Sequence, residues 1–191
     1  MSARCPVSSF YRRSSYRSVE LAVGPAYWPV LGWAALLALV QTMLVPVFVF
    51  RGAVPSLVTI VVVLYAVRVG VRRAALLAIP AGLLEDIFAG TGGGWTISTT
   101  IVAMLVGAFS RRMFADGAFA PSMLCGIAVL GRDVIFWAVM RLEGYPPGYA
   151  VAHAHAALWS ALLTAIVAFA WLLVRGRLVA DKTTVERFGE R

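Results

Sequence analysis

Four ionisable residues stand inside apolar stretches of this 191-residue sequence, and their side chains are the ones that could carry chemistry. Glu85 and Asp86 are neighbours in one stretch, and Arg132 and Asp133 are neighbours in another. Each charge is costly in hydrocarbon, so such groups pair between helices, line a pocket or a partner-binding surface, or relay protons. Pairing is favoured, because a relay needs more titratable groups along several helices than these stretches contain.

The spacing of these charges predicts which of them meet. Asp86 and Asp133 each lie about 12 residues from the start of their apolar stretch, which places both at a depth of roughly 18 Å. Adjacent helical residues project about 100° apart, so Arg132 and Asp133 face different neighbours. We therefore expect Arg132 to pair with Asp86 across the bundle, while Asp133 faces another helix or a cavity.

Small and hydroxyl-bearing residues predict close contacts between helices. Ala78, Gly82 and Gly90 share the helix face of Asp86 at four-residue spacing, and such a face lets another backbone approach closely. The next apolar stretch begins with hydroxyl-bearing residues and ends near Gly107. Its hydroxyls either bond to their own helix on a close-packing face or form a polar pocket near the outer side of the membrane.

The composition requires elements that are surrounded by lipid. Apolar residues make up 61% of the chain and charged residues 14%, and a soluble domain of this length has too little interior to bury so many apolar groups. A spanning helix needs about 20 mostly apolar residues. The sequence predicts an all-α membrane protein, a compact bundle of about six transmembrane helices at residues 28–50, 54–70, 74–89, 95–109, 121–140 and 153–174. The third and fourth are short and require tilt, local thinning or burial in protein.

The basic residues alternate between two sides of this predicted bundle. Of the 17 Arg and Lys residues, fourteen fall in the two tails and in the second and fourth connections, and only Arg51 and Arg141 fall on the other side. The positive-inside rule then places both termini in the cytoplasm. The predicted organisation is a basic tail (1–27), a transmembrane domain (28–174) and a second basic tail (175–191). Because the net charge of +8 is divided among short clusters, nucleic-acid binding is not expected.

The remaining candidate features do not form a reactive site. His153 and His155 are two residues apart and point to different helix faces, and no third metal ligand is evident. The glycines at 92–94 lack the Lys-Ser/Thr that completes a nucleotide-binding loop, so they predict a tight turn. No nucleophile is positioned beside a base. We expect no catalytic residue, metal, cofactor or small-molecule substrate.

Four segments resemble the MreD family, the membrane component of the bacterial rod-shape machinery. Residues 41–46, Gln-Thr-Met-Leu-Val-Pro, are similar to that family's Gln-Thr-x-Leu-x-Pro motif. Residues 52–55, Gly-Ala-Val-Pro, follow, although Ser56 stands where the family often has Asp. Residues 81–86, Ala-Gly-Leu-Leu-Glu-Asp, end at the family's acidic position, and Asp133 stands where the family commonly has Glu or Asp.

The resemblance implies a non-enzymatic scaffold of the bacterial inner membrane that regulates peptidoglycan synthesis during cell elongation. Such proteins associate with MreC, a single-span partner with a periplasmic domain, and through it with RodA, the elongation transpeptidase and the MreB filament. Gln41, Asp86 and Asp133 would then be structural or partner-binding residues.

The MreD family is also similar in fold to the substrate-binding subunits of energy-coupling-factor transporters, which supplies an alternative function, the binding of a vitamin. Such a subunit should carry an outward pocket beneath a longer polar loop. The outer loops here are a glycine turn and an aromatic, proline-rich loop that contains Tyr145, Pro146 and Tyr149. Rigid aromatic residues suit contact with a periplasmic partner. Small-residue faces suit docking in both cases, so the sequence leaves both functions open.

Overall fold

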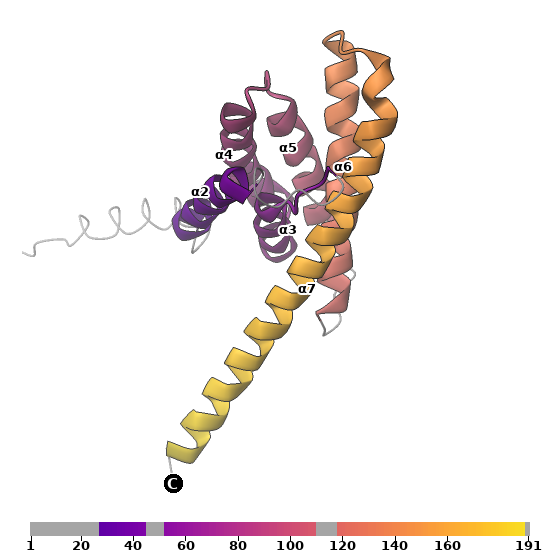
Figure 1. Cartoon of the computed structure of the whole chain (residues 1–191). Coiled ribbons are helices and arrows are strands. Elements are labelled where there is room, and N and C mark those ends of the chain that lie inside the picture. The colour runs from indigo at the N-terminus through magenta and orange to yellow at the C-terminus, as the bar shows by residue number, and fades with distance from the viewer. Residues whose placement is uncertain (1–26, 45–51, 110–117, 190–191) are drawn as a thin grey trace, which may run out of the picture.

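The computed structural model describes residues 27–44, 52–109 and 118–189, and this part of the chain is all-helical (Figure 1). Each predicted apolar stretch coincides with one α-helix, although residues 45–50 of the first stretch lie outside the described part. The elements are α2 (Tyr27–Leu44), α3 (Leu57–Val69), α4 (Val71–Ala89), α5 (Gly94–Phe109), α6 (Phe119–Leu142), the 3-10 turn η2 (Pro147–Tyr149) and α7 (Ala150–Gly189).

In the described part of the chain, two helices are long and apolar enough to cross a membrane. They are α6 and the Ala150–Arg175 part of α7. By contrast α3 has 13 residues and rises only about 20 Å, less than the roughly 30 Å thickness of a bilayer core. The last helix also differs from its predicted end at residue 174, because α7 continues as one helix of 40 residues to Gly189. The predicted C-terminal tail is therefore largely a helical extension.

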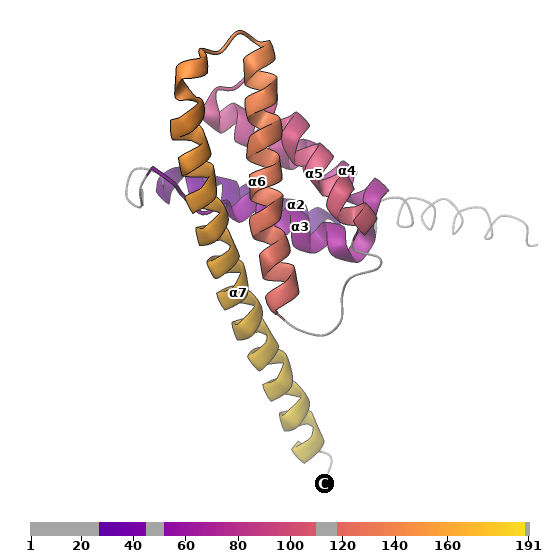
Figure 2. The ribbon, with the colours of Figure 1, turned by 90° about the vertical axis from the view of Figure 1, so that its right-hand side faces the viewer.

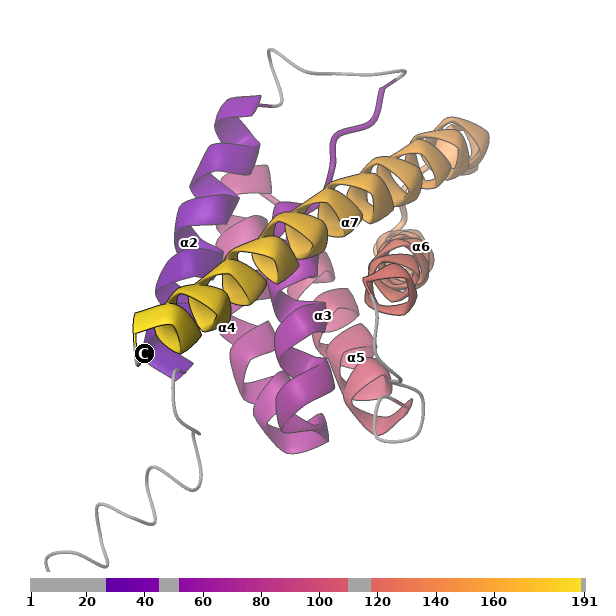
Figure 3. The same cartoon turned by 90° about the horizontal axis from the view of Figure 1, so that it is seen from below.

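The helices form two antiparallel hairpins that are inclined to one another. Helices α6 and α7 stand side by side as a long hairpin, and α4 and α5 form a shorter one (Figures 1 and 2). Seen from below, α6 is viewed end-on, whereas α2, α3, α4 and α5 lie across the view (Figure 3). Helix α3 is central, since it contacts each of the five other α-helices that the structure describes.

The core is built from small side chains, and the large apolar side chains face outward. Buried apolar positions are mostly Ala and Val, and Leu77 is the largest fully buried side chain. Large apolar residues are exposed along α2, α4, α5, α6 and α7, and Ile87, Ile127 and Val134 are each more than 60% exposed. Water-soluble proteins prefer to bury these residue types. The observed distribution suits a lipid surround, where small residues mediate helix contacts.

Glycines set the distance between α4 and its neighbours, as the small-residue pattern predicts. A Cβ atom placed on Gly82 would lie 2.6 Å from the Cα atom of Thr96 in α5. A Cβ atom on Gly107, at the other end of α5, would lie 2.8 Å from the backbone nitrogen of Val71. Both contacts are with backbone, so neither can be relieved by a side-chain movement.

Replacement of Gly82 by alanine should therefore destabilise the protein by about 1–3 kcal/mol, the usual range for forcing an extra methyl group into a packed core. The measurement is the free energy of unfolding in detergent. Gly131→Ala in α6 is the matched control, because a Cβ atom there meets only a side-chain methyl of Val102 at 3.7 Å. Equal stability of the two variants would show that α4 and α5 are not in backbone contact.

Candidate functional site

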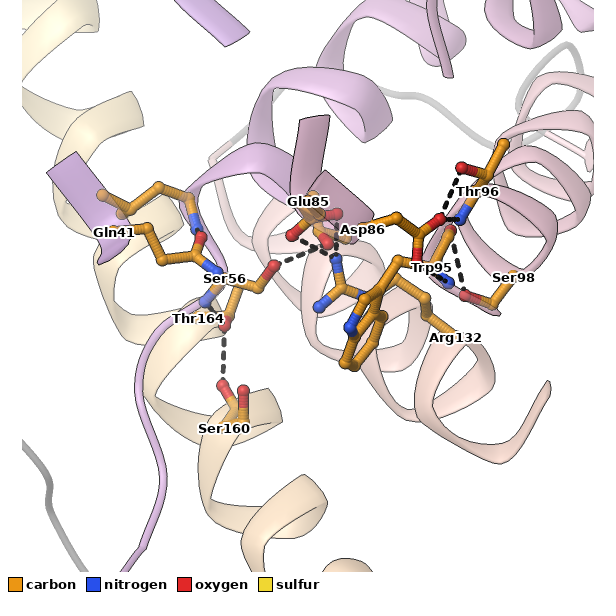
Figure 4. Close-up of polar contacts among 12 residues, drawn as sticks. Gln41, Ser56, Glu85, Asp86, Trp95, Thr96, Ser98, Arg132, Ser160 and Thr164 are labelled. Carbon is orange, nitrogen blue, oxygen red and sulfur yellow. Dashed lines mark hydrogen bonds and ion pairs between the residues drawn. The ribbon is translucent and has the colours of Figure 1, made fainter. Parts of the chain in front are cut away.

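Polar side chains from five helices and one connection meet in the interior and form what we call the polar layer (Figure 4). Its members come from distant parts of the sequence and are joined by hydrogen bonds or by an ion pair. They are Gln41, Ser56, Glu85, Asp86, Trp95, Thr96, Arg132, Ser160 and Thr164.

An ion pair between Glu85 of α4 and Arg132 of α6 lies at the centre of the polar layer. The Nη1 atom of Arg132 donates to both carboxylate oxygens of Glu85, at 3.0 Å and 2.9 Å. The two side chains are 9% and 5% exposed. The guanidinium group also lies over the Trp95 ring, 4.5 Å from its centroid, in a cation–π contact. The prediction that Arg132 reaches the helix of the acidic pair is confirmed, but the predicted partner, Asp86, is wrong.

The carboxylate of Asp86 accepts hydrogen bonds from the first turn of α5. One carboxylate oxygen accepts the backbone N–H of Trp95 at 3.0 Å and the hydroxyl of Thr91. The other accepts the backbone N–H of Thr96 at 2.8 Å and its hydroxyl at 2.6 Å. The first N–H groups of a helix have no partner within the helix, and a carboxylate beside them is also favoured by the helix dipole. Asp86 therefore joins α4 to α5 and has no free oxygen for Arg132.

The N-terminus of α3 starts inside the bundle and is held by side chains from two other helices. The N–H of Leu57 donates to Oε1 of Gln41 at 2.9 Å, and the N–H of Ser56 donates to Oγ1 of Thr164 at 2.9 Å. Ser160 in turn donates its hydroxyl to the carbonyl of Val54 at 2.8 Å. The first N–H groups of a helix have no partner within the helix, and the bonds to Gln41 and Thr164 supply partners for them inside the protein.

Sequence reasoning singled out Gln41 but missed Ser160 and Thr164. The available signal was two hydroxyl-bearing residues four positions apart in the otherwise apolar stretch 153–174. Their common helix face is directed toward the segment that precedes α3, as the two hydrogen bonds show.

Asp133 projects from α6 about 100° away from Arg132 and lies near α7, in agreement with the expectation that it faces another helix. It is 6% exposed and lies within electrostatic range of His153 in α7. Among the described residues, no donor forms a hydrogen bond with its carboxylate. The ring of His153 stacks on Trp137, with centroids 5.2 Å apart. His155 instead accepts a hydrogen bond from Trp159 at 3.2 Å, so the two histidines have different neighbours.

The hydroxyl-bearing residues of α5 divide into two groups. Thr96 bonds Asp86, and Ser98 donates to the carbonyl of Trp95 at 3.1 Å. The hydroxyls of Thr99 and Thr100 are buried and have no hydrogen-bond partner among the described residues. The helix is thus a close-packing element at Thr96 and Gly107, with two unused hydroxyls between them.

Aromatic rings continue from the polar layer to the loop after α6. Trp95 stacks on Phe136, with centroids 3.9 Å apart and planes at 11°. Trp137 meets Tyr145 edge-on at 6.0 Å, and Tyr145 lies 6.1 Å from Tyr149. Tyr145 is 47% exposed and Tyr149 is 61% exposed, and Pro146 between them is exposed as well. The loop predicted to contact a partner thus presents its rings at the surface.

A groove of about 310 Å³ lies between α6 and α7, apart from the polar layer. Its walls are apolar and combine small residues with larger side chains. The lining residues are Met123, Gly126, Ile127, Leu130, Leu158, Trp159, Ala161, Leu162 and Ala165.

Comparison of the chain with protein-family models, with curated proteins and with solved structures found no match. The contacts of the polar layer indicate what its side chains do. Its charged side chains, Glu85, Asp86 and Arg132, all form hydrogen bonds or an ion pair with another helix. The polar layer is suited to fixing the relative positions of helices.

Proposed function

We propose that this chain is a multi-pass inner-membrane scaffold of the MreD type, which regulates peptidoglycan synthesis during cell elongation. The main support is that residues of the motifs that resemble MreD form contacts between helices. Gln41 comes from one of these motifs and Gly82 and Asp86 from another, and each of the three makes a specific contact with another helix. Because these motif residues hold the helices together, they favour a rigid scaffold that acts through a binding surface.

The proposal includes six membrane-spanning helices with both termini in the cytoplasm. The turn after α4 and the end of α6 lie at one end of the bundle, since Gly92 and Gly94 are next to Glu143 and Phe136. The α3–α4 junction lies at the other end, where Gly107 packs against it. That end carries the exposed Arg68 and Arg72, as the positive-inside rule requires of the cytoplasmic side.

The short α3 is compatible with a spanning segment because its N-terminus need not reach the bilayer surface. The bonds from Gln41 and Thr164 satisfy its first N–H groups within the protein. Broken or short helices occur at membrane depth where they are buried in this way.

The alternative, a vitamin-binding transporter subunit, has weaker support. A pocket for a polar small molecule combines apolar walls with a few convergent polar groups. The groove between α6 and α7 has apolar walls, and none of its lining residues belongs to the polar layer.

Purification from native membranes in a mild detergent tests the proposed function. We expect a single-span protein with a large periplasmic domain to be recovered with the chain. The double variant Tyr145→Ala/Tyr149→Ala should recover less of it, because exposed aromatic residues commonly dominate binding energy. Phe109→Ala is the matched control, since Phe109 is 64% exposed but lies at the opposite end of α5 from the glycine turn. Loss of the protein should also round the cells without changing vitamin uptake. Recovery of an ATPase pair with a bound small molecule would overturn the scaffold proposal.

A further inference from the structure

The guanidinium group of Arg132 is only partly used by the ion pair. Both of its hydrogen bonds to Glu85 leave from the same nitrogen, Nη1. The Nε atom is buried and has no partner among the described residues, and the whole residue is 4% exposed. Guanidinium is always protonated and carries five N–H donors, so a buried Nε–H without an acceptor is an exception that requires an explanation.

A second unused polar group lies across the α5–α6 interface at the same level. The hydroxyl of Thr99 has no partner among the described residues, and Thr99 is 2% exposed. Trp95 stacks on Phe136, and Val102 is the residue nearest to Gly131, so the two antiparallel helices are in register there. Thr99 lies between Trp95 and Val102 on the same face of α5, because i, i+4 and i+7 positions align. By this alignment, Thr99 lies opposite the turn of α6 that contains Arg132.

The contact with Trp95 places the guanidinium group of Arg132 against the face of α5 that also carries Thr99. The central carbon of the guanidinium lies 4.5 Å from the centroid of the Trp95 ring, and Thr99 is the next residue along that face. We therefore expect the side chain of Arg132 to pass beside Thr99 before it reaches Trp95. The Nε–H needs an acceptor, and the hydroxyl of Thr99 can both donate and accept.

We propose that a water molecule is bound between Nε of Arg132 and the hydroxyl of Thr99, so that the polar layer is internally hydrated. Buried waters occupy sites of this kind, where otherwise unsatisfied polar groups face one another. The inference does not depend on the proposed function of the protein.

Charge and size favour water over other ligands. An anion would suit a guanidinium edge, but Glu85 already neutralises Arg132, and Asp133 adds a further buried carboxylate on the same helix. A second negative group would be repelled by both carboxylates, so the ligand must be neutral. Arg132 and Thr99 are almost completely enclosed, which leaves access only to a very small molecule.

Nuclear magnetic resonance of the full chain in lipid nanodiscs, with ¹⁵N-labelled arginine, tests the proposal. The Nε–H signal of Arg132 is identified by its disappearance in Arg132→Lys. We expect this signal to show a magnetisation-transfer cross-peak to water in the wild type and in Thr99→Ser, which keeps the hydroxyl. The cross-peak should be lost in Thr99→Val, and it should persist in Thr100→Val, which removes the neighbouring unused hydroxyl.

Two results would overturn the proposal. One is a folded wild-type protein whose Arg132 Nε–H has no contact with water. The other is a cross-peak that persists unchanged in Thr99→Val. If Thr99→Val does not fold, the wild type and Thr99→Ser decide the question by the presence or absence of the cross-peak.

Discussion

Replacement of Arg132 by methionine should lower the free energy of unfolding by about 3–5 kcal/mol, because it leaves the carboxylate of Glu85 buried without its partner. Glu85→Leu should have a loss of similar size, since it leaves the guanidinium uncompensated. The double variant Glu85→Leu/Arg132→Met removes both charges and places apolar groups of similar volume in the core. It should be more stable than either single variant and close to the wild type. Reversible unfolding in mixed micelles measures all four proteins.

Arg141→Met provides the control for this cycle. Arg141 is on the same helix but is exposed, and its hydrogen bond to the carbonyl of Tyr145 is a surface contact. Exposed contacts of this type contribute about 0–1 kcal/mol, so its loss should be small. If the losses of the two single variants simply add in the double variant, Glu85 and Arg132 are not paired.

Replacement of Asp86 by alanine should destabilise the protein by at least about 3 kcal/mol, because several donors at the start of α5 lose their acceptor together. Each buried donor left without an acceptor costs about 1–3 kcal/mol. The loss should be local as well as global, since the carboxylate holds the backbone N–H groups of Trp95 and Thr96. Hydrogen–deuterium exchange should be faster in the first turn of α5 than in the wild type.

Glu143→Ala is the matched control for Asp86→Ala. Glu143 is an exposed carboxylate near the same glycine turn, and its oxygens lie 3.8–3.9 Å from the position of a Cβ atom on Gly92. Its removal should leave exchange in α5 unchanged. Unchanged exchange in Asp86→Ala itself would show that the carboxylate does not cap α5.

The sequence alone determined where the helices lie and which charges are buried. Each apolar stretch became one helix, because helix formation within a stretch depends on local residue types and on breakers such as Gly70 and Gly90. Glu85, Asp86, Arg132 and Asp133 were all predicted to lie in the interior, and all four are buried. The close approach of α5 to Gly82 was also predictable, since four-residue spacing of small residues is a property of one helix face.

Only the tertiary structure decided which groups are bonded to one another. Glu85 and Asp86 are adjacent and chemically alike, so their choice of partner depends on the rotation of α4 relative to α5 and α6, which no local pattern encodes. The bond between Ser56 and Thr164 joins residues 108 positions apart, and it satisfies the backbone N–H of the residue that precedes α3. The packing of whole helices sets such contacts, because a difference of about 100° around one axis exchanges one neighbour for another.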